Sequence, residues 1–178
     1  MEILRLLVKL ISSHPTFNLH GSMGGNAMLG IFKRLLDGSG KIDEADKEAR
    51  LRIATCVVLL EAATADNTFS EREQRKVFEI LKSRYGMSDA EVKELIDESE
   101  RAREDEADIW YFTHLINQNM SNEEKYSLME EVWEIIYSDG TLGELENYVA
   151  QKLYRMLNID HSKFIELKMK VRSEVEGV

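Results

Sequence analysis

Apolar residues recur along most of this chain at intervals of three and four positions, the spacing that places them on one face of an α-helix. No stretch alternates convincingly with the period of two that a half-buried β-strand requires, and the only proline is Pro15. The pattern predicts a first long helix over residues 42–66. Further helices are expected around the apolar groups that begin at Val77, Val92, Ile109, Met129, Tyr148 and Phe164. We therefore expect an all-α fold, a single-domain bundle of about eight or nine helices joined by short loops.

Three of these helices have a recognisable start. Ser70, Ser88 and Ser121 are each followed three positions later by a glutamate. In this Ser-x-x-Glu pattern the two side chains satisfy free backbone N–H groups in the first turn of a helix, an arrangement called a capping box. The pattern therefore predicts a helix N-terminus at each serine.

The most informative pattern is an internal repeat. When the sequence is shifted by 73 positions, residues 54–81 align with residues 127–154, and in each copy an apolar helix ends at an acidic turn that leads into a second helix. Apolar positions are kept only in type, whereas four of the five identical positions are acids. The identical pairs are Glu61/Glu134, Asp66/Asp139, Thr68/Thr141, Glu71/Glu144 and Glu73/Glu146. We expect repeat units at about residues 45–97 and 121–170, which give the bundle an internal pseudo-two-fold repeat.

The N-terminal part of the chain differs from the rest. Residues 1–12 form a very apolar segment that predicts a short helix, residues 17–25 a Gly-rich connector, and residues 27–36 a second helical segment. We therefore divide the chain into an N-terminal helical extension, residues 1–41, and a helical domain, residues 42–178. The first helix either packs on the domain or in a homodimer, or it contacts a membrane surface. We favour packing because so little of the helix is polar.

Charge and composition narrow the function classes. The net charge of −10 argues against nucleic acid, which is bound through Lys and Arg, and it favours cations or basic protein partners. Residues 1–36 carry a net charge of +3 and residues 37–178 carry −13. A single cysteine excludes a disulfide within the chain, and no apolar run approaches the ~20 residues that cross a bilayer. With no recognisable secretory cleavage site, we expect a cytoplasmic protein, in contact with the membrane periphery at most.

The repeated acids are candidate metal ligands. Glu61 lies about 7 Å before Asp66 along the incoming helix, and Glu73 lies at a comparable distance on the outgoing one. If the two helices are antiparallel, the three carboxylates form an oxygen-rich site of the kind that Ca²⁺, Mg²⁺ or Mn²⁺ uses. The second repeat offers the same geometry with Glu134, Asp139 and Glu146. Zn²⁺ is disfavoured because no Cys or His stands at zinc spacing.

Helix capping is the competing explanation of these acids. Thr68 with Glu71 and Thr141 with Glu144 also match the capping box, and the helix dipole favours acids in a first turn by ~0.3–1 kcal/mol each. Capping accounts less well for Glu61, which lies near a helix C-terminus where the dipole disfavours a negative charge. The same holds for Glu134. Spacing alone leaves both explanations open.

Catalysis finds little support in the sequence. The four histidines are scattered, and Cys56 lies in an apolar helical run where a buried, inert thiol is expected. His114, alone on its helix, is expected to be structural or solvated. The acids border exposed turns with no apolar pocket that would raise a carboxylate pKa, so hydrolase chemistry is the least favoured alternative. We expect a protein that is not an enzyme.

The two acidic turns resemble the TerB family, the all-helical tellurite-resistance domain. The resemblance lies in Glu61, Ala65-Asp66-Asn67 and Glu73, in Glu134, Ser138-Asp139-Gly140 and Glu146, and in the following Leu157-Asn158-Ile159, and it covers roughly residues 45–170. It implies a helical bundle with internal pseudo-symmetry, a metal-binding acidic face formed by those six acids, and a role in bacterial stress-response and membrane-associated complexes. Asn67 stands where the family usually has glycine, and residues 1–40 match nothing in the family.

Two functions remain open from the sequence. The first is a helical module that binds divalent cations through the acidic turns and docks on a protein partner. The second is a metal-independent interaction protein, whose acidic face receives a basic partner and whose N-terminal helix supports oligomerisation or membrane contact. The two differ in their response to divalent ions and to salt.

Overall fold

The computed structural model describes residues 44–66, 69–106, 108–140 and 142–177, which belong to one compact unit spanning Lys41–Val178. The described residues contain seven α-helices, one short 3-10 helix and no strand, as expected for an all-α fold. The elements are α3 (Glu44–Ala63), α4 (Glu71–Tyr85), α5 (Asp89–Asp105), α6 (Trp110–Asn119), α7 (Asn122–Ile136), η1 (Tyr137–Asp139), α8 (Glu144–Met156) and α9 (His161–Glu176). The helices expected at residues 1–12 and 27–36, and the connector between them, lie outside the described residues, so the proposed division of the chain stays a prediction.

The order of the helices follows the sequence repeat. α4 begins at Glu71 and α8 at Glu144, the two positions that the 73-residue shift brings together. The series α3, α4, α5 therefore corresponds to α7, α8, α9, and α6 lies between the two copies. The equivalent helices α3 and α7 pack against each other, so the first helix of each repeat lies at the junction of the two copies.

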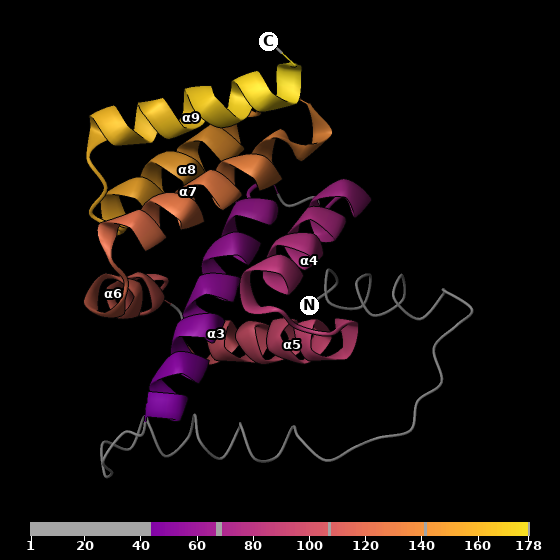
Figure 1. Cartoon of the computed structure of the whole chain (residues 1–178), viewed down its shortest axis with the longest axis vertical. Coiled ribbons are helices and arrows are strands. Elements are labelled where there is room, and N and C mark those ends of the chain that lie inside the picture. Colours follow the sequence, from indigo (N-terminus) through magenta and orange to yellow (C-terminus); the bar gives the residue numbers. More distant parts are fainter. Residues whose placement is uncertain (1–43, 67–68, 107, 141, 178) are drawn as a thin grey trace. The chain divides into compact units, whose positions relative to one another are not determined.

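Helix α3 is the centre of the fold. Every residue from Ile53 to Leu60 is buried, because this part of the helix is apolar on all sides and must be covered on all sides. Figure 1 shows α3 in indigo running through the described helices, with α5 crossing nearer its lower end and α7 and α8 near its upper end. α4, α5 and α6 also contact α3, so helices of both repeats enclose it.

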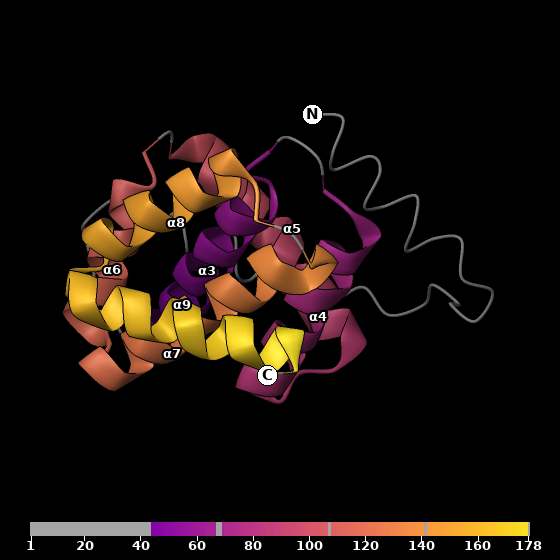
Figure 2. The same ribbon diagram turned by 90° about the horizontal axis from the view of Figure 1, so that it is seen from above.

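A second apolar centre lies among α7, α8 and α9. Seen from above in Figure 2, α9 lies against α7. The Trp133 side chain is fully buried, and its ring centroid is 5.3 Å from that of Phe164. Phe164 in turn stacks on Tyr154 with centroids 4.1 Å apart. These aromatic contacts join the three helices of the second repeat.

Replacing Phe164 with alanine should destabilise the domain by ~3–5 kcal/mol, because it removes a buried ring from the contacts with Trp133 and Tyr154. The free energy of unfolding in urea measures the effect. Tyr148→Ala is the control, since this side chain on α8 is 66% exposed and its loss should change stability by less than ~0.5 kcal/mol. Equal effects of the two substitutions would contradict this account of the core.

Candidate functional site

The two acidic turns lie close together in the structure. The first joins α3 to α4 and carries Asp66 and Glu73, and the second joins α7 to α8 through η1 and carries Asp139 and Glu146. Helix α4 packs against η1, which places the start of the α4 helix beside the second turn. We call these four carboxylates, Asp66, Glu73, Asp139 and Glu146, the acidic cluster.

Both glutamates of the cluster are buried caps, each only 6% exposed. The backbone N–H of Ser70 donates to Glu73 Oε2 at 2.7 Å, and the N–H of Glu73 donates to Ser70 Oγ at 3.2 Å. In the second turn the backbone N–H of Gly143 donates to Glu146 Oε2. A Cβ at residue 143 would approach that oxygen to 3.1 Å, so glycine lets the carboxylate fold back closely.

The structure corrects one expectation about these turns. The N-cap residues are Ser70 and Gly143, so Glu71 and Glu144 are the first residues of their helices and not the partners of a threonine in a capping box. Thr68 and Thr141 lie outside the described residues. The capping boxes expected at Ser70, Ser88 and Ser121 are confirmed, each with the N-cap N–H bonded to the glutamate at 2.7 Å.

The carboxylates of the two turns influence one another. Burial raises the pKa of Glu73 above its ordinary value, and the charges of Asp66 and Asp139 raise it further. Burial likewise raises the pKa of Glu146, with contributions from Asp139, Glu73 and Asp66. The hydrogen bonds from Ser70 and Gly143 act in the opposite direction but do not cancel the effect. Four like charges from both repeats therefore share one region, which favours an added positive charge.

The donor set of the cluster fits a hard cation. Because the capping bonds use only Oε2, the Oε1 atoms of Glu73 and Glu146 make no hydrogen bond with a described residue. Carboxylate oxygens are the ligands that Ca²⁺, Mg²⁺ and Mn²⁺ prefer. Among the described residues, however, no three His, Cys, Asp or Glu side chains stand together in a ready-made metal-binding group. A cation would have to draw the carboxylates of the two turns closer.

The remaining two predicted ligands, Glu61 and Glu134, have cationic partners. Lys152 Nζ lies 3.2 Å from Glu61 Oε1, and Arg103 Nη2 lies 3.6 Å from Glu61 Oε2. Lys76 Nζ lies 3.4 Å from Glu134 Oε2. Each glutamate is thus paired with a lysine of the other repeat, which gives a physical reason for an acid near a helix C-terminus. Their role as metal ligands stays a prediction.

Cys56 and His114 are the other side chains whose chemistry the sequence analysis considered. Cys56 is fully buried, and burial raises its thiol pKa to about 12, so it is protonated and inert near neutral pH. His114 is exposed and stacks on Trp110. No helix in the described part of the chain is long and apolar enough to cross a membrane.

Comparison with known proteins identifies one family. The sequence model described as Tellurite resistance protein TerB matches residues 52–169, from within α3 into α9, a span that contains both acidic turns. No curated protein matches the chain, and no solved structure does.

The burial of Glu73 and Glu146, together with the neighbouring charges, predicts how stability depends on pH in metal-free protein. Since the pKa of each glutamate is raised in the folded state, the folded state binds protons more tightly than the unfolded chain. Proton binding by these two glutamates therefore stabilises the folded state fully below the ordinary carboxyl pKa of 4.5. This stabilisation is lost as the pH rises through their raised pKa values in the folded protein. A Glu73→Gln/Glu146→Gln variant keeps the capping oxygens but carries no charge there.

We expect this variant to be more stable than the wild type at pH 7, and the difference to shrink as pH falls towards 4.5. Urea denaturation of chelator-treated, dialysed protein at a series of pH values measures the free energy of unfolding of the wild type and of the variant at each pH. A variant that is less stable than the wild type over the whole range would contradict the raised pKa values of Glu73 and Glu146.

Proposed function

This chain belongs to the TerB family, and from that premise we propose that its helical domain is a non-enzymatic module that binds a divalent cation at the acidic cluster. The observation that carries the proposal is that two buried capping glutamates, Glu73 and Glu146, lie in one region with the negative charges of Asp66 and Asp139. Like charges held in a partly buried region repel, and a divalent cation offsets that repulsion more effectively than water does. The expected ions are Ca²⁺, Mg²⁺ or Mn²⁺, because the donors are carboxylate oxygens.

Binding at this position would act on the whole domain. Asp66 and Glu73 follow α3, whereas Asp139 and Glu146 follow α7, so a cation held by both pairs ties the two repeats together. It would also reduce the negative charge that a protein partner meets at this end of the domain. Both effects suit a module that docks on a partner when an ion is present, in a bacterial stress-response complex in the cytoplasm or at the membrane periphery.

The proposal assigns no catalytic role to the cluster. Glu73 and Glu146 each hold a backbone N–H through one oxygen, so both have a structural task as helix caps. A carboxylate in this position is a fixed ligand and not a mobile acid or base. The one cysteine is buried and protonated.

A metal-independent interaction protein is the second candidate. It is favoured by the lack of a ready-made metal-binding group among the described residues. In that case the acidic cluster receives a basic partner directly, and residues 1–12 support a homodimer or a membrane contact. The interaction would weaken as salt is added and would not respond to divalent ions.

Thermal melts of chelator-treated protein, with and without Ca²⁺, Mg²⁺ or Mn²⁺, test the proposed function. A cation at 100 times its dissociation constant should add ~2.7 kcal/mol to the free energy of unfolding and raise the melting temperature. The Glu73→Gln/Glu146→Gln variant should lose this shift, because it retains the caps but not the charges.

The matched control is Glu71→Gln/Glu144→Gln, which removes the same charge from exposed positions in the same two first turns. This control should keep the cation-dependent shift. Glu61→Gln separates the acidic cluster from the six ligands predicted from the sequence: the shift is kept if Glu61, held by Lys152 and Arg103, is not a ligand, and is lost if it is. If no ion shifts the wild-type melt, or if the control loses the shift equally, the cation proposal is wrong and the interaction protein is favoured.

A further inference from the structure

A second surface of the domain differs from the acidic cluster in both charge and composition. Trp110, His114 and Gln118 stand four positions apart along α6 and form one row on its exposed side. The Trp110 side chain is 56% exposed, and its ring stacks on His114 with centroids 4.6 Å apart. The His114 ring is in turn hydrogen-bonded to Gln118 at 2.9 Å. An exposed tryptophan held flat by its neighbours is a preorganised platform for an aromatic or apolar group.

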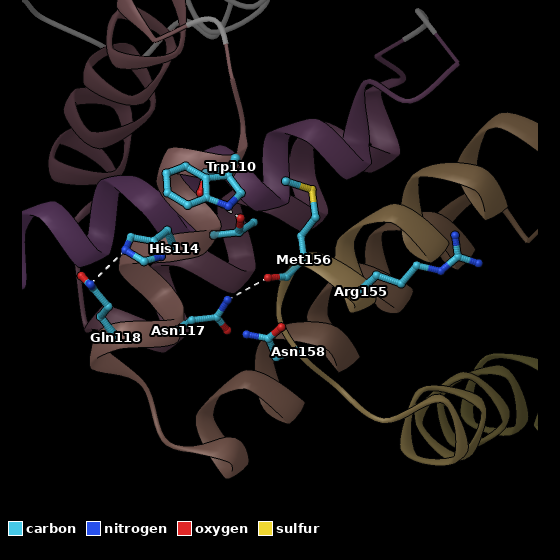
Figure 3. A pocket seen from close by; sticks show the side chains of 8 residues that line it. Trp110, His114, Asn117, Gln118, Arg155, Met156 and Asn158 are labelled. Carbon is cyan, nitrogen blue, oxygen red and sulfur yellow. Dashed lines mark hydrogen bonds between the residues drawn. The ribbon is translucent and has the colours of Figure 1, made fainter.

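Hollows lie on both sides of this row. On one side, a cavity of about 390 Å³ lies between α6 and the end of α8. Arg155 and Asn158 border it on the α8 side. Figure 3 shows Trp110 and His114 above Asn117, with the Asn158 amide next to that of Asn117 in this view and Arg155 extending away from Trp110. On the other side, a cavity of about 200 Å³ lies between α6 and α3. Gln118 borders both hollows, and we call the two together the α6 groove.

The charge of the α6 groove is opposite to that of the domain. Lys47 and Arg50 line the smaller hollow and Arg155 the larger one, and no acid among the described residues lines either. Arg155 donates to Tyr154 Oη at 3.3 Å, and neither arginine makes an ion pair with a described residue. Lys47 is ion-paired with Glu44 at 3.7 Å and is flanked in sequence by Asp46 and Glu48, so the arginines are the groove's cations without an acidic partner among the described residues. Asp108 accepts a hydrogen bond from the backbone N–H of Trp110. Each hollow is thus lined by an arginine without an acidic partner among the described residues, although residues 37–178 carry a net charge of −13.

The groove also contains an acceptor that needs a donor. Asn117 Nδ2 donates to the backbone oxygen of Met156 at 2.7 Å, which fixes the orientation of the amide. Asn117 Oδ1 is closed to solvent and has no hydrogen-bond partner. Buried acceptors are normally satisfied, and a backbone N–H of a polypeptide is a donor that would fit this oxygen if local rearrangement opens access to it.

We propose that the α6 groove binds a short acidic segment of another protein, with an aromatic or apolar side chain on Trp110 and carboxylates at Arg155 and Arg50. The two hollows on either side of Gln118 suit an extended chain better than a compact small molecule. Charge complementarity selects the partner, since an acidic segment is repelled by most of the domain and attracted here.

Isothermal titration of the full chain with short blocked peptides tests the proposal. The peptides carry a central Phe flanked on both sides by Glu at several spacings, and a matching set carries Gln in place of Glu. At least one acidic peptide should bind, about tenfold more tightly than its Gln counterpart, with affinity that falls as salt is added. Trp110→Ala and Arg155→Gln should each weaken binding about tenfold.

Arg72→Gln is the matched control, because it removes the same charge from an exposed position on α4 outside the groove. It should leave the affinity unchanged. Equal loss in Arg72→Gln and Arg155→Gln, or equal binding of Glu and Gln peptides, would overturn the proposal. Binding of ATP that depends on Trp110, with no binding of any acidic peptide, would overturn it in favour of a small-ligand site. The Glu73→Gln/Glu146→Gln variant should bind the peptide like wild type, so this test is independent of the cation site.

Discussion

The need to cover α3 on every side determines most of this structure. Residues from Ile53 to Leu60 face all directions around the helix and are nearly all apolar, so no single neighbouring helix can bury them. Helices of both repeats surround α3, and the equivalent helix α7 lies against it. The turn that follows α3 is thereby brought towards the turn that follows α7. The meeting of the two acidic turns is a consequence of apolar packing, which is strong enough to hold four carboxylates near one another.

The acidic cluster shows how one residue type can meet two demands. Glu73 and Glu146 satisfy backbone N–H groups that would otherwise be unpaired at the starts of α4 and α8. The same burial that makes them good caps raises their pKa and strengthens their repulsion from the neighbouring aspartates. Uncharged glutamine would cap the helices equally well. The helix dipole favours a negative charge in each first turn, but burial beside two aspartates acts against it.

Features with a local signal could be predicted from the sequence, and features assembled from distant segments could not. Helical periodicity predicted the fold, and Ser-x-x-Glu predicted the starts of three helices. The same pattern failed at Thr68 because Ser70 is the N-cap two residues later, and at Thr141 because the N-cap is Gly143, which has no side chain to recognise. Glu61 pairs with a lysine 91 positions away, beyond the reach of any local pattern. The α6 groove, built from three separate helices, gave no signal at all.

The exchange of charges between the repeats also bears on how this domain could be divided. Lys152 in the second repeat pairs with Glu61 in the first, and Lys76 in the first pairs with Glu134 in the second. A chain cut between α5 and α6 would leave both glutamates without their lysines and would expose the face of α3 that α6, α7 and α8 cover. The sequence repeat is thus half of a folding unit, and the smallest autonomous form of this architecture contains both copies.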